Sequence, residues 1–160
     1  MKAFLLAAGN GTRLRPLTDS VPKCLLPIQS VPLLEIWLSN CKAVGITDVL
    51  VNTHAHAEAI RQFAAEQKTG VRMHIVEEPE LLGSAGTLAE NRKFIAREES
   101  FFVLYADVLT NVDLRRMLAF HTQKRLRATL GIYQVADPAR CGIVTMDGNA
   151  VISDFIEKPA

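Results

Sequence analysis

The sequence has little of the material that marks several large classes of protein. Its three cysteines, Cys24, Cys41 and Cys141, are too few and too scattered for a disulfide framework. No Cys-x-x-Cys pair is present, so we expect a reducing compartment, the cytoplasm. The formal net charge is only +1, which argues against nucleic acid or a membrane surface as the partner, since both attract a basic excess.

Long apolar runs are also missing. No stretch approaches the length needed to cross a bilayer. The apolar start, residues 4–8, leads into a charged turn rather than a cleavage site, so it predicts a buried strand and not a signal peptide. Nearly half of the 160 residues are apolar, which at this length predicts one globular domain over residues 1–160.

Strand-like and helix-like segments alternate along most of the chain. Apolar runs predict strands at 4–8, 48–52, 71–76 and 101–106, and helical spacing predicts helices at 33–44, 55–66, 83–95 and 113–124. Alternation of this kind implies parallel strands joined by right-handed crossovers. Three further strands, 128–135, 142–146 and 151–156, close the sequence, the last two around an Asp147-Gly148 hairpin turn. We therefore expect an α/β, Rossmann-like three-layer sandwich with a mostly parallel central sheet and an antiparallel C-terminal portion.

A glycine turn, Gly9-Asn10-Gly11, follows the first strand. It is neither a P-loop nor a dinucleotide fingerprint, because Leu14 stands where a third glycine would be needed. Glycines allow close approach of a ligand, and successive N–H groups in such a turn form an anion-binding concavity. A plain tight turn is the alternative for the glycines alone.

Cationic residues around this turn favour a polyphosphate ligand. Arg13, Arg15 and Lys23 lie close to it in sequence, and Lys2 more loosely. A guanidinium binds phosphate as a planar fork, and an ammonium binds it as a point charge. One such cation is readily explained as a solvated surface residue, but several around one turn indicate an anion site.

Asp107 follows a continuous apolar run, 101–106. The carboxyl ends of parallel strands are where open α/β sheets bind their ligands. A carboxylate there suits Mg²⁺, which takes one or two carboxylates and completes its shell with phosphates and water. The alternative is an aspartate that caps the following loop.

Glu78 precedes a glycine-rich helix start, Gly83-Ser84-Ala85-Gly86-Thr87. A carboxylate is poorly suited to phosphate but suits a base edge with N–H donors, as in guanine, uracil or thymine. Adenine has no ring N–H, so Glu78 argues mildly against ATP. The alternative is a helix N-terminus with Ser84 or Thr87 as its cap and the acidic residues complementing the helix dipole.

The last motif is Glu157-Lys158-Pro159. Glutamate accepts hydrogen bonds from hydroxyls and lysine binds phosphate, so the pair suits a sugar phosphate if the strand is irregular there. An exposed ion pair of little energetic value is the alternative, and spacing alone favours it.

In this order, the motifs resemble the signature of the sugar-1-phosphate nucleotidylyltransferases, and most closely the mannose-1-phosphate guanylyltransferase branch. The resemblance spans the chain, through residues 7–18, 22–23, 77–79, 82–87, 106–109, 141–144 and 157–159. Two departures are small: the family often has proline where Cys24 stands and glycine where Ala106 stands. The resemblance also implies that the chain is the N-terminal part of a longer catalytic domain, incomplete at its C-terminal end.

The resemblance assigns roles to individual residues. Arg13, Lys23 and Asp107 would be catalytic, with Asp107 also binding Mg²⁺. The nucleotide would contact Leu6, Ala8, Gly9, Gly11, Thr12, Arg13, Lys23, Glu78 and Gly83. The sugar phosphate would contact Gly142, Glu157 and Lys158.

The activity that the resemblance implies is transfer of a nucleoside monophosphate from a nucleoside triphosphate to a sugar 1-phosphate, with release of pyrophosphate. GTP is favoured, and dTTP and UTP are open. The alternative is a non-catalytic subunit that binds a nucleotide or a nucleotide sugar for regulation or assembly. The resemblance also leaves a homo-oligomer open.

Overall fold

The computed structural model describes residues 1–159. The chain forms two compact units, Met1–Arg116 and Met117–Ala160, and each is described by itself. Within residues 1–159, the helices are all too short or too polar to cross a membrane. The expectation of one domain over the whole chain stays a prediction.

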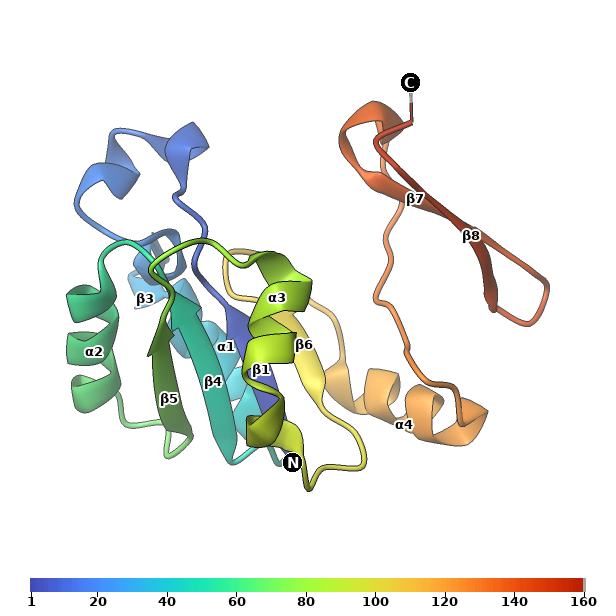
Figure 1. The fold of residues 1–160 in the computed structure, drawn as a ribbon, viewed down its shortest axis with the longest axis horizontal. Helices are drawn as coiled ribbons and strands as arrows, with labels where there is room; N and C mark the ends of the chain where they lie inside the picture. The colour runs from blue at the N-terminus through green and yellow to red at the C-terminus, as the bar shows by residue number, and fades with distance from the viewer. Residues whose placement is uncertain (160) are drawn as a thin grey trace. The chain divides into compact units, whose positions relative to one another are not determined.

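A four-stranded parallel sheet forms the centre of the first unit (Figure 1). Its order is β5-β4-β1-β6, with β1 at Lys2–Leu6, β4 at Asp48–Thr53, β5 at Arg72–Glu77 and β6 at Phe102–Tyr105. The chain leaves β1 toward β4 on one side and later returns to β6 on the other. In such an order the connections run in opposite directions from β1, so the switch point lies between β1 and β6. Ligands bind beside such a switch point.

Helices cover both faces of this sheet. Figure 1 shows α3 (Gly83–Glu90) in front of it and α1 (Leu33–Ala43) behind it. On the α3 face, Phe4, Leu6 and Leu50 form a buried cluster, against which Leu88 of α3 and Phe94 pack. Sheet residues that point the other way, such as Val51, are fully buried as well. Burial on both faces explains why the central strands read as continuous apolar runs, and the three-layer prediction is confirmed.

Several short elements connect the strands. Between β1 and α1 the chain makes three 3-10 turns, Thr12–Leu14, Leu17–Asp19 and Lys23–Leu25, and a small antiparallel pair, β2 (Pro27–Ile28) and β3 (Val31–Pro32). Cys24, which is 2% exposed, anchors the third turn. The remaining helix of the first unit, α2 (Ala57–Glu66), links β4 to β5.

The second unit contains the C-terminal hairpin. Helix α4 (Leu114–Lys124) begins in the first unit and continues into the second, followed by β7 (Gly142–Met146) and β8 (Ile152–Glu157), which pair antiparallel. Asp147 stabilises the hairpin turn because its Oδ1 accepts hydrogen bonds from the N–H groups of Asn149 and Val151 at 2.9 Å each. These bonds lower the pKa of Asp147. The predicted hairpin is therefore confirmed.

The strand predicted at 128–135 is wrong. This segment has no regular structure, and its apolar side chains Leu130, Ile132 and Tyr133 are 51%, 50% and 81% exposed. A strand needs a neighbour for its backbone hydrogen bonds, and within residues 1–159 no strand pairs with this segment. Its alternating apolar pattern is real, but a pattern alone does not supply a partner.

Two predicted boundaries also shift. The helix predicted at 83–95 ends at Glu90 and is followed by a separate 3-10 turn, Arg92–Ile95. The first strand ends at Leu6 rather than Ala8. Its end has a physical cause, because the Ala7 N–H donates to the side chain of Asn52 and not to a strand backbone.

Candidate functional site

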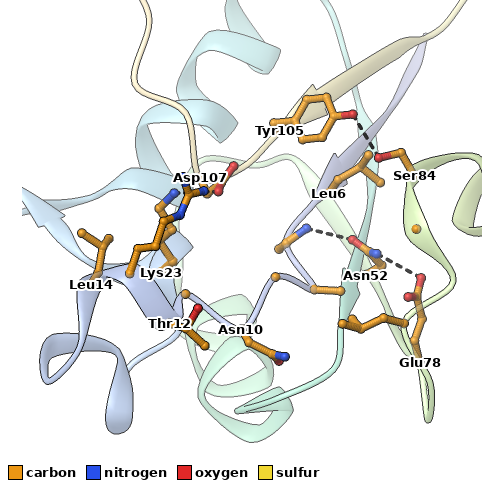
Figure 2. Close-up of a pocket in the computed structure, with 17 residues that line it drawn as sticks. Leu6, Asn10, Thr12, Leu14, Lys23, Asn52, Glu78, Ser84, Tyr105 and Asp107 are labelled. Carbon is orange, nitrogen blue, oxygen red and sulfur yellow. Dashed lines mark hydrogen bonds and ion pairs between the residues drawn. The ribbon is translucent and has the colours of Figure 1, made fainter. Parts of the chain in front are cut away.

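A cavity of about 490 Å³ lies at the carboxyl edge of the sheet, and all of its residues belong to the first unit (Figure 2). This volume falls in the range of small-molecule sites. The lining consists of Leu6, Ala7, Ala8, Gly9, Asn10, Gly11, Thr12, Arg13, Leu14, Lys23, Asn52, Glu78, Leu81, Gly83, Ser84, Tyr105 and Asp107. Every catalytic and nucleotide-binding residue expected from the sequence is therefore at this cavity.

The glycine turn is held by Thr18. Gly11 has a φ of +63°, and a Cβ on it would lie 2.9 Å from Thr18 Cγ2, so this position requires glycine. The Gly11 carbonyl accepts hydrogen bonds from the Leu14 N–H at 2.9 Å and from Thr18 Oγ1 at 2.8 Å. Thr18 is 5% exposed and lies outside the cavity lining. It shapes the turn from behind.

Four cations were expected around the turn. Two of them, Arg13 and Lys23, line the cavity. Arg15 lies outside the lining and forms an exposed ion pair with Asp19, Nε to Oδ1 at 3.2 Å. Lys2 begins the strand at its opposite end, where Nζ donates to the Phe94 carbonyl at 2.8 Å. Arg15 and Lys2 are therefore not part of the cavity lining, because proximity in sequence does not set the direction of a side chain.

Lys23 and Asp107 form an ion pair, Nζ to Oδ2 at 2.7 Å, and Figure 2 shows them together. Asp107 lies just past β6, where the Ala106 N–H still donates to the Leu6 carbonyl at 3.0 Å. The hydrogen bond that the Asp107 carboxylate makes is to Lys23 and not to a backbone N–H of the next loop. Asp107 therefore stands at the sheet edge as predicted, and the loop-cap alternative is wrong.

The donor set at Asp107 fits Mg²⁺ rather than a metal held wholly by protein. Within the described chain, no group of three or more histidine, cysteine, aspartate or glutamate side chains comes together as a metal cluster. Asp107 contributes a single carboxylate with a side chain 36% exposed, in a cavity that also holds cations. Mg²⁺ commonly takes one or two carboxylates and fills its other positions with phosphate oxygens and water.

Glu78 is a buried carboxylate that accepts hydrogen bonds from three neutral donors. It is 3% exposed, and its Oε1 accepts hydrogen bonds from Thr87 Oγ1 at 2.5 Å and Asn52 Nδ2 at 3.0 Å. Its Oε2 accepts the Leu82 N–H at 3.2 Å. Burial by itself raises the pKa of Glu78, but these hydrogen bonds outweigh it and leave the pKa below its ordinary value. Glu78 is thus ionised at neutral pH.

The alternative explanation of Glu78 and residues 83–87, a capped helix N-terminus, holds in one respect only. Helix α3 has no side-chain cap, because Ser84 Oγ pairs with the Tyr105 hydroxyl at 3.0 Å and Thr87 donates to Glu78. Glu78 does accept the N–H of Leu82, the residue before the helix, and so satisfies one N-terminal donor. Its carboxylate therefore supports the helix start as well as the cavity wall.

Sequence reasoning missed the partners of the expected residues. Asn52, Ser84 and Tyr105 line the cavity without having been predicted there. A signal existed for Asn52 and Tyr105, because each stands at or next to the carboxyl end of an apolar strand, as Asp107 does. Nothing in the sequence indicates that the Ser84 hydroxyl meets Tyr105.

The three residues expected to contact the sugar phosphate lie in the second unit. Gly142 faces Glu157 in the β7-β8 register, and a Cβ on Gly142 would come within 2.6 Å of Phe155. Lys158 has a φ of +47°, which is the irregular backbone that the motif requires, and its N–H donates to the Cys141 carbonyl at 3.0 Å. The exposed ion pair is also present, Lys158 Nζ to Glu157 Oε1 at 3.6 Å. A sugar-binding role stays a prediction for all three.

Together, a parallel sheet with a cavity that charged residues line at its switch point defines a ligand-binding α/β domain of the doubly wound type. The chain belongs to the nucleotidyl transferase family, whose profile matches residues 2–160. The resemblance inferred from the motifs is confirmed.

Known relatives agree with this assignment. The chain is 34% identical to a mannose-1-phosphate guanyltransferase of Gibberella zeae and 36% identical to a mannose-1-phosphate guanylyltransferase catalytic subunit beta of Danio rerio, covering 99% of this chain and 45% of each relative. A Bacillus anthracis structure assigned as a glucose-1-phosphate thymidylyltransferase, in complex with a sucrose, superimposes with a TM-score of 0.87 at 26% identity, over 99% of this chain and 65% of that one. The chain thus spans less than half the length of these curated relatives.

Proposed function

We propose that the protein transfers a nucleoside monophosphate from a nucleoside triphosphate to a sugar 1-phosphate. The observation that carries this proposal is the composition of the cavity, where a glycine turn, two cations and two carboxylates share one edge of the sheet. A triphosphate suits the turn with Thr12, Arg13 and Lys23, and a base suits the wall that contains Glu78 and Gly83. The backbone of Leu6, Ala8 and Gly9 would lie along the base and ribose.

The proposed reaction needs no general base. A phosphate oxygen of the sugar 1-phosphate, already ionised at neutral pH, attacks the α-phosphorus. The new P–O bond forms as the bond to the β-phosphate breaks, and its electron pair leaves with pyrophosphate. Catalysis would rest on aligning two anions and neutralising their charge, the task of Arg13 and Lys23. Mg²⁺, when held by Asp107, would add a Lewis acid to the phosphate oxygens.

The base preference follows from the free acceptor capacity of Glu78. An ionised carboxylate offers about four acceptor positions, and three are used by Thr87, Asn52 and the Leu82 N–H. The position left on Oε2 can accept one ring N–H, which guanine, uracil and thymine possess and adenine lacks. Because the curated relatives named above are mannose-1-phosphate guanylyltransferases, we propose GTP and mannose 1-phosphate as the first pair to test.

The remaining parts of the proposal concern the sugar 1-phosphate site, the cellular compartment and the partners. Gly142, Glu157 and Lys158 would bind the sugar phosphate. The three cysteines are free thiols, and Cys24 and Cys41 are buried, which suits a reducing compartment such as the cytoplasm. We propose no nucleic-acid or membrane partner, and self-association is an open part of the proposal.

Pyrophosphate release tests the proposed reaction. GTP, dTTP, UTP and ATP are each combined with mannose 1-phosphate or glucose 1-phosphate and Mg²⁺. We expect the fastest release with GTP and mannose 1-phosphate and the slowest with ATP. Nucleotide binding without turnover, whichever pair is used, would instead support the non-catalytic alternative. If the protein neither binds nor turns over any of these nucleotides, both functions are overturned.

A further inference from the structure

Asn52 is a buried amide that joins three segments of the cavity wall. It ends the apolar part of β4 and is 4% exposed. Its Oδ1 accepts the N–H of Ala7 at 2.8 Å, two residues before the glycine turn. Its Nδ2 donates to Glu78 Oε1 at 3.0 Å and is 3.1 Å from Thr87 Oγ1. Figure 2 shows Asn52 between the start of the turn and Glu78.

We infer that Asn52 is the positioning residue for base selection, acting by fixing the Glu78 carboxylate relative to the glycine turn. This inference rests on the proposed function. The turn would hold the phosphates and Glu78 would contact the base. The position of the Glu78 carboxylate relative to the turn would then decide which base can reach it while the phosphates are bound. Asn52 hydrogen-bonds both to Glu78 and to Ala7, the residue from which the chain runs into the turn.

An amide is the group that this position requires. Ala7 presents a donor and Glu78 presents an acceptor, so the side chain between them must offer one acceptor and one donor on a rigid plane. Asparagine does so. Aspartate would keep the acceptor for Ala7 but would set a second carboxylate against Glu78, and leucine would satisfy neither group.

The neighbouring contacts explain why the loss of Asn52 would not be compensated. Glu78 Oε1 would keep only the Thr87 hydroxyl, which is also 3.1 Å from the Gly83 carbonyl and can donate its one proton to either. Without the amide, Oε1 would depend on this one shared donor, and the carboxylate would be held less firmly although the Leu82 N–H still bonds Oε2. Preorganised groups select ligands because they need no rearrangement on binding.

Asn52→Asp, which is nearly isosteric, is the principal variant. The ratio of GTP affinity to ATP affinity is measured by calorimetry, and inorganic tripolyphosphate serves as a probe of the turn alone. We expect the GTP-to-ATP ratio to fall about ten-fold or more, the scale of a hydrogen bond to a charged group. Tripolyphosphate affinity should change less than this ratio, because aspartate still accepts the Ala7 N–H.

Thr53→Val is the matched control. Thr53 is the next residue of β4, is fully buried and donates to the Ala55 carbonyl at 3.2 Å, so it contacts neither Glu78 side-chain oxygen nor Ala7. Thr53→Val should change neither the GTP-to-ATP affinity ratio nor the tripolyphosphate affinity. If Asn52→Asp does not fold, Asn52→Ala carries the test, because it removes the donor to Glu78 Oε1 without adding a charge and should lower the same ratio.

A double-mutant cycle with Glu78→Gln separates positioning from general packing. If Asn52 acts through Glu78, adding Asn52→Asp to Glu78→Gln should cause little further loss of discrimination, whereas independent effects would add. Additive losses, or a GTP-to-ATP ratio unchanged by Asn52→Asp, would overturn the inference and leave the proposed function standing. Absence of any base preference in the unmodified protein would instead count against the proposed function.

Discussion

The two ends of the central sheet hold a carboxylate in different ways. At the carboxyl edge, Glu78 is buried and receives only neutral donors, from Asn52, Thr87 and the Leu82 N–H. At the amino edge, Asp48 pairs with Arg72 Nη1 at 2.9 Å and His74 Nε2 at 3.1 Å.

The pKa is lowered at both carboxylates, but the causes differ. For Asp48 the largest cause is the hydrogen bond from His74, followed by that from Thr47, and Arg72 adds its charge. For Glu78, burial raises the pKa, and the hydrogen bonds from neutral donors overcome it, with a smaller contribution from the charge of His54. Asp48 is paired with a positive charge at the protein surface, whereas Glu78 keeps a negative charge that a ligand can use. A lowered pKa alone therefore does not identify a functional carboxylate.

The largest expected effect contrasts two arginines of the glycine turn. Arg13→Ala removes a cation from the cavity lining, and Arg15→Ala removes one from an exposed pair with Asp19. If the proposed reaction is correct, Arg13→Ala should lower the rate of pyrophosphate release by about a hundred-fold or more, and Arg15→Ala should leave it nearly unchanged. Circular dichroism should show both variants folded. Equal rates for the two variants would contradict a role for Arg13 in the cavity.

A smaller effect concerns stability and contrasts the two carboxylates. Glu78→Ala removes the carboxylate that accepts from the buried Asn52 amide and from the Leu82 N–H, which we expect to cost about 1–3 kcal/mol in the free energy of unfolding. Asp48→Ala breaks a pair whose Arg72 side chain is 74% exposed, and should cost less than about 1 kcal/mol. Urea denaturation of the two variants measures both. A larger loss at Asp48 would show that the surface cluster, and not the cavity wall, stabilises the sheet.

The smallest effect separates the two carboxylates by pH and salt. Both pKa values are lower in the folded state, so each carboxylate contributes stability above its unfolded pKa, near 4, and loses it as pH falls through the folded pKa. At neutral pH, added salt should weaken the Asp48–Arg72 contribution, because screening acts on charged pairs. The Glu78 contribution should change less with salt, since its hydrogen-bond donors are neutral and the charge of His54 is the smallest cause of its lowered pKa. Denaturation of Asp48→Asn and Glu78→Gln at low and high salt checks this, and the same salt response in both would refute the distinction.

The residues that could be predicted from sequence are those whose position follows from a strand end. The glycine turn after β1 and Asp107 after β6 fall at one edge because parallel strands end together. Glu78 follows β5 by the same rule. What the rule cannot supply is the pairing of side chains across strands, which depends on register: Leu6 stands opposite Asn52 and Tyr105.

Other features escaped prediction because they depend on distant neighbours. Arg13 and Arg15 are alike in sequence, and their different surroundings separate them. The segment 128–135 has the pattern of a strand, yet strand formation depends on a partner that the pattern does not encode. Thr18 supports Gly11 only because the chain turns back on itself between them.

The ion pair of Lys23 and Asp107 affects how a ligand would reach the cavity. The charged residues of the lining are two cations, Arg13 and Lys23, and two carboxylates, Glu78 and Asp107, so the lining carries no net charge. A neutral lining exerts little long-range pull on a diffusing polyanion, and fast electrostatic steering requires an excess of one sign. Recognition must then arise at contact, where Lys23 would exchange its ion pair with Asp107 for one with a phosphate of the ligand. The association rate of a polyphosphate should accordingly depend only weakly on ionic strength.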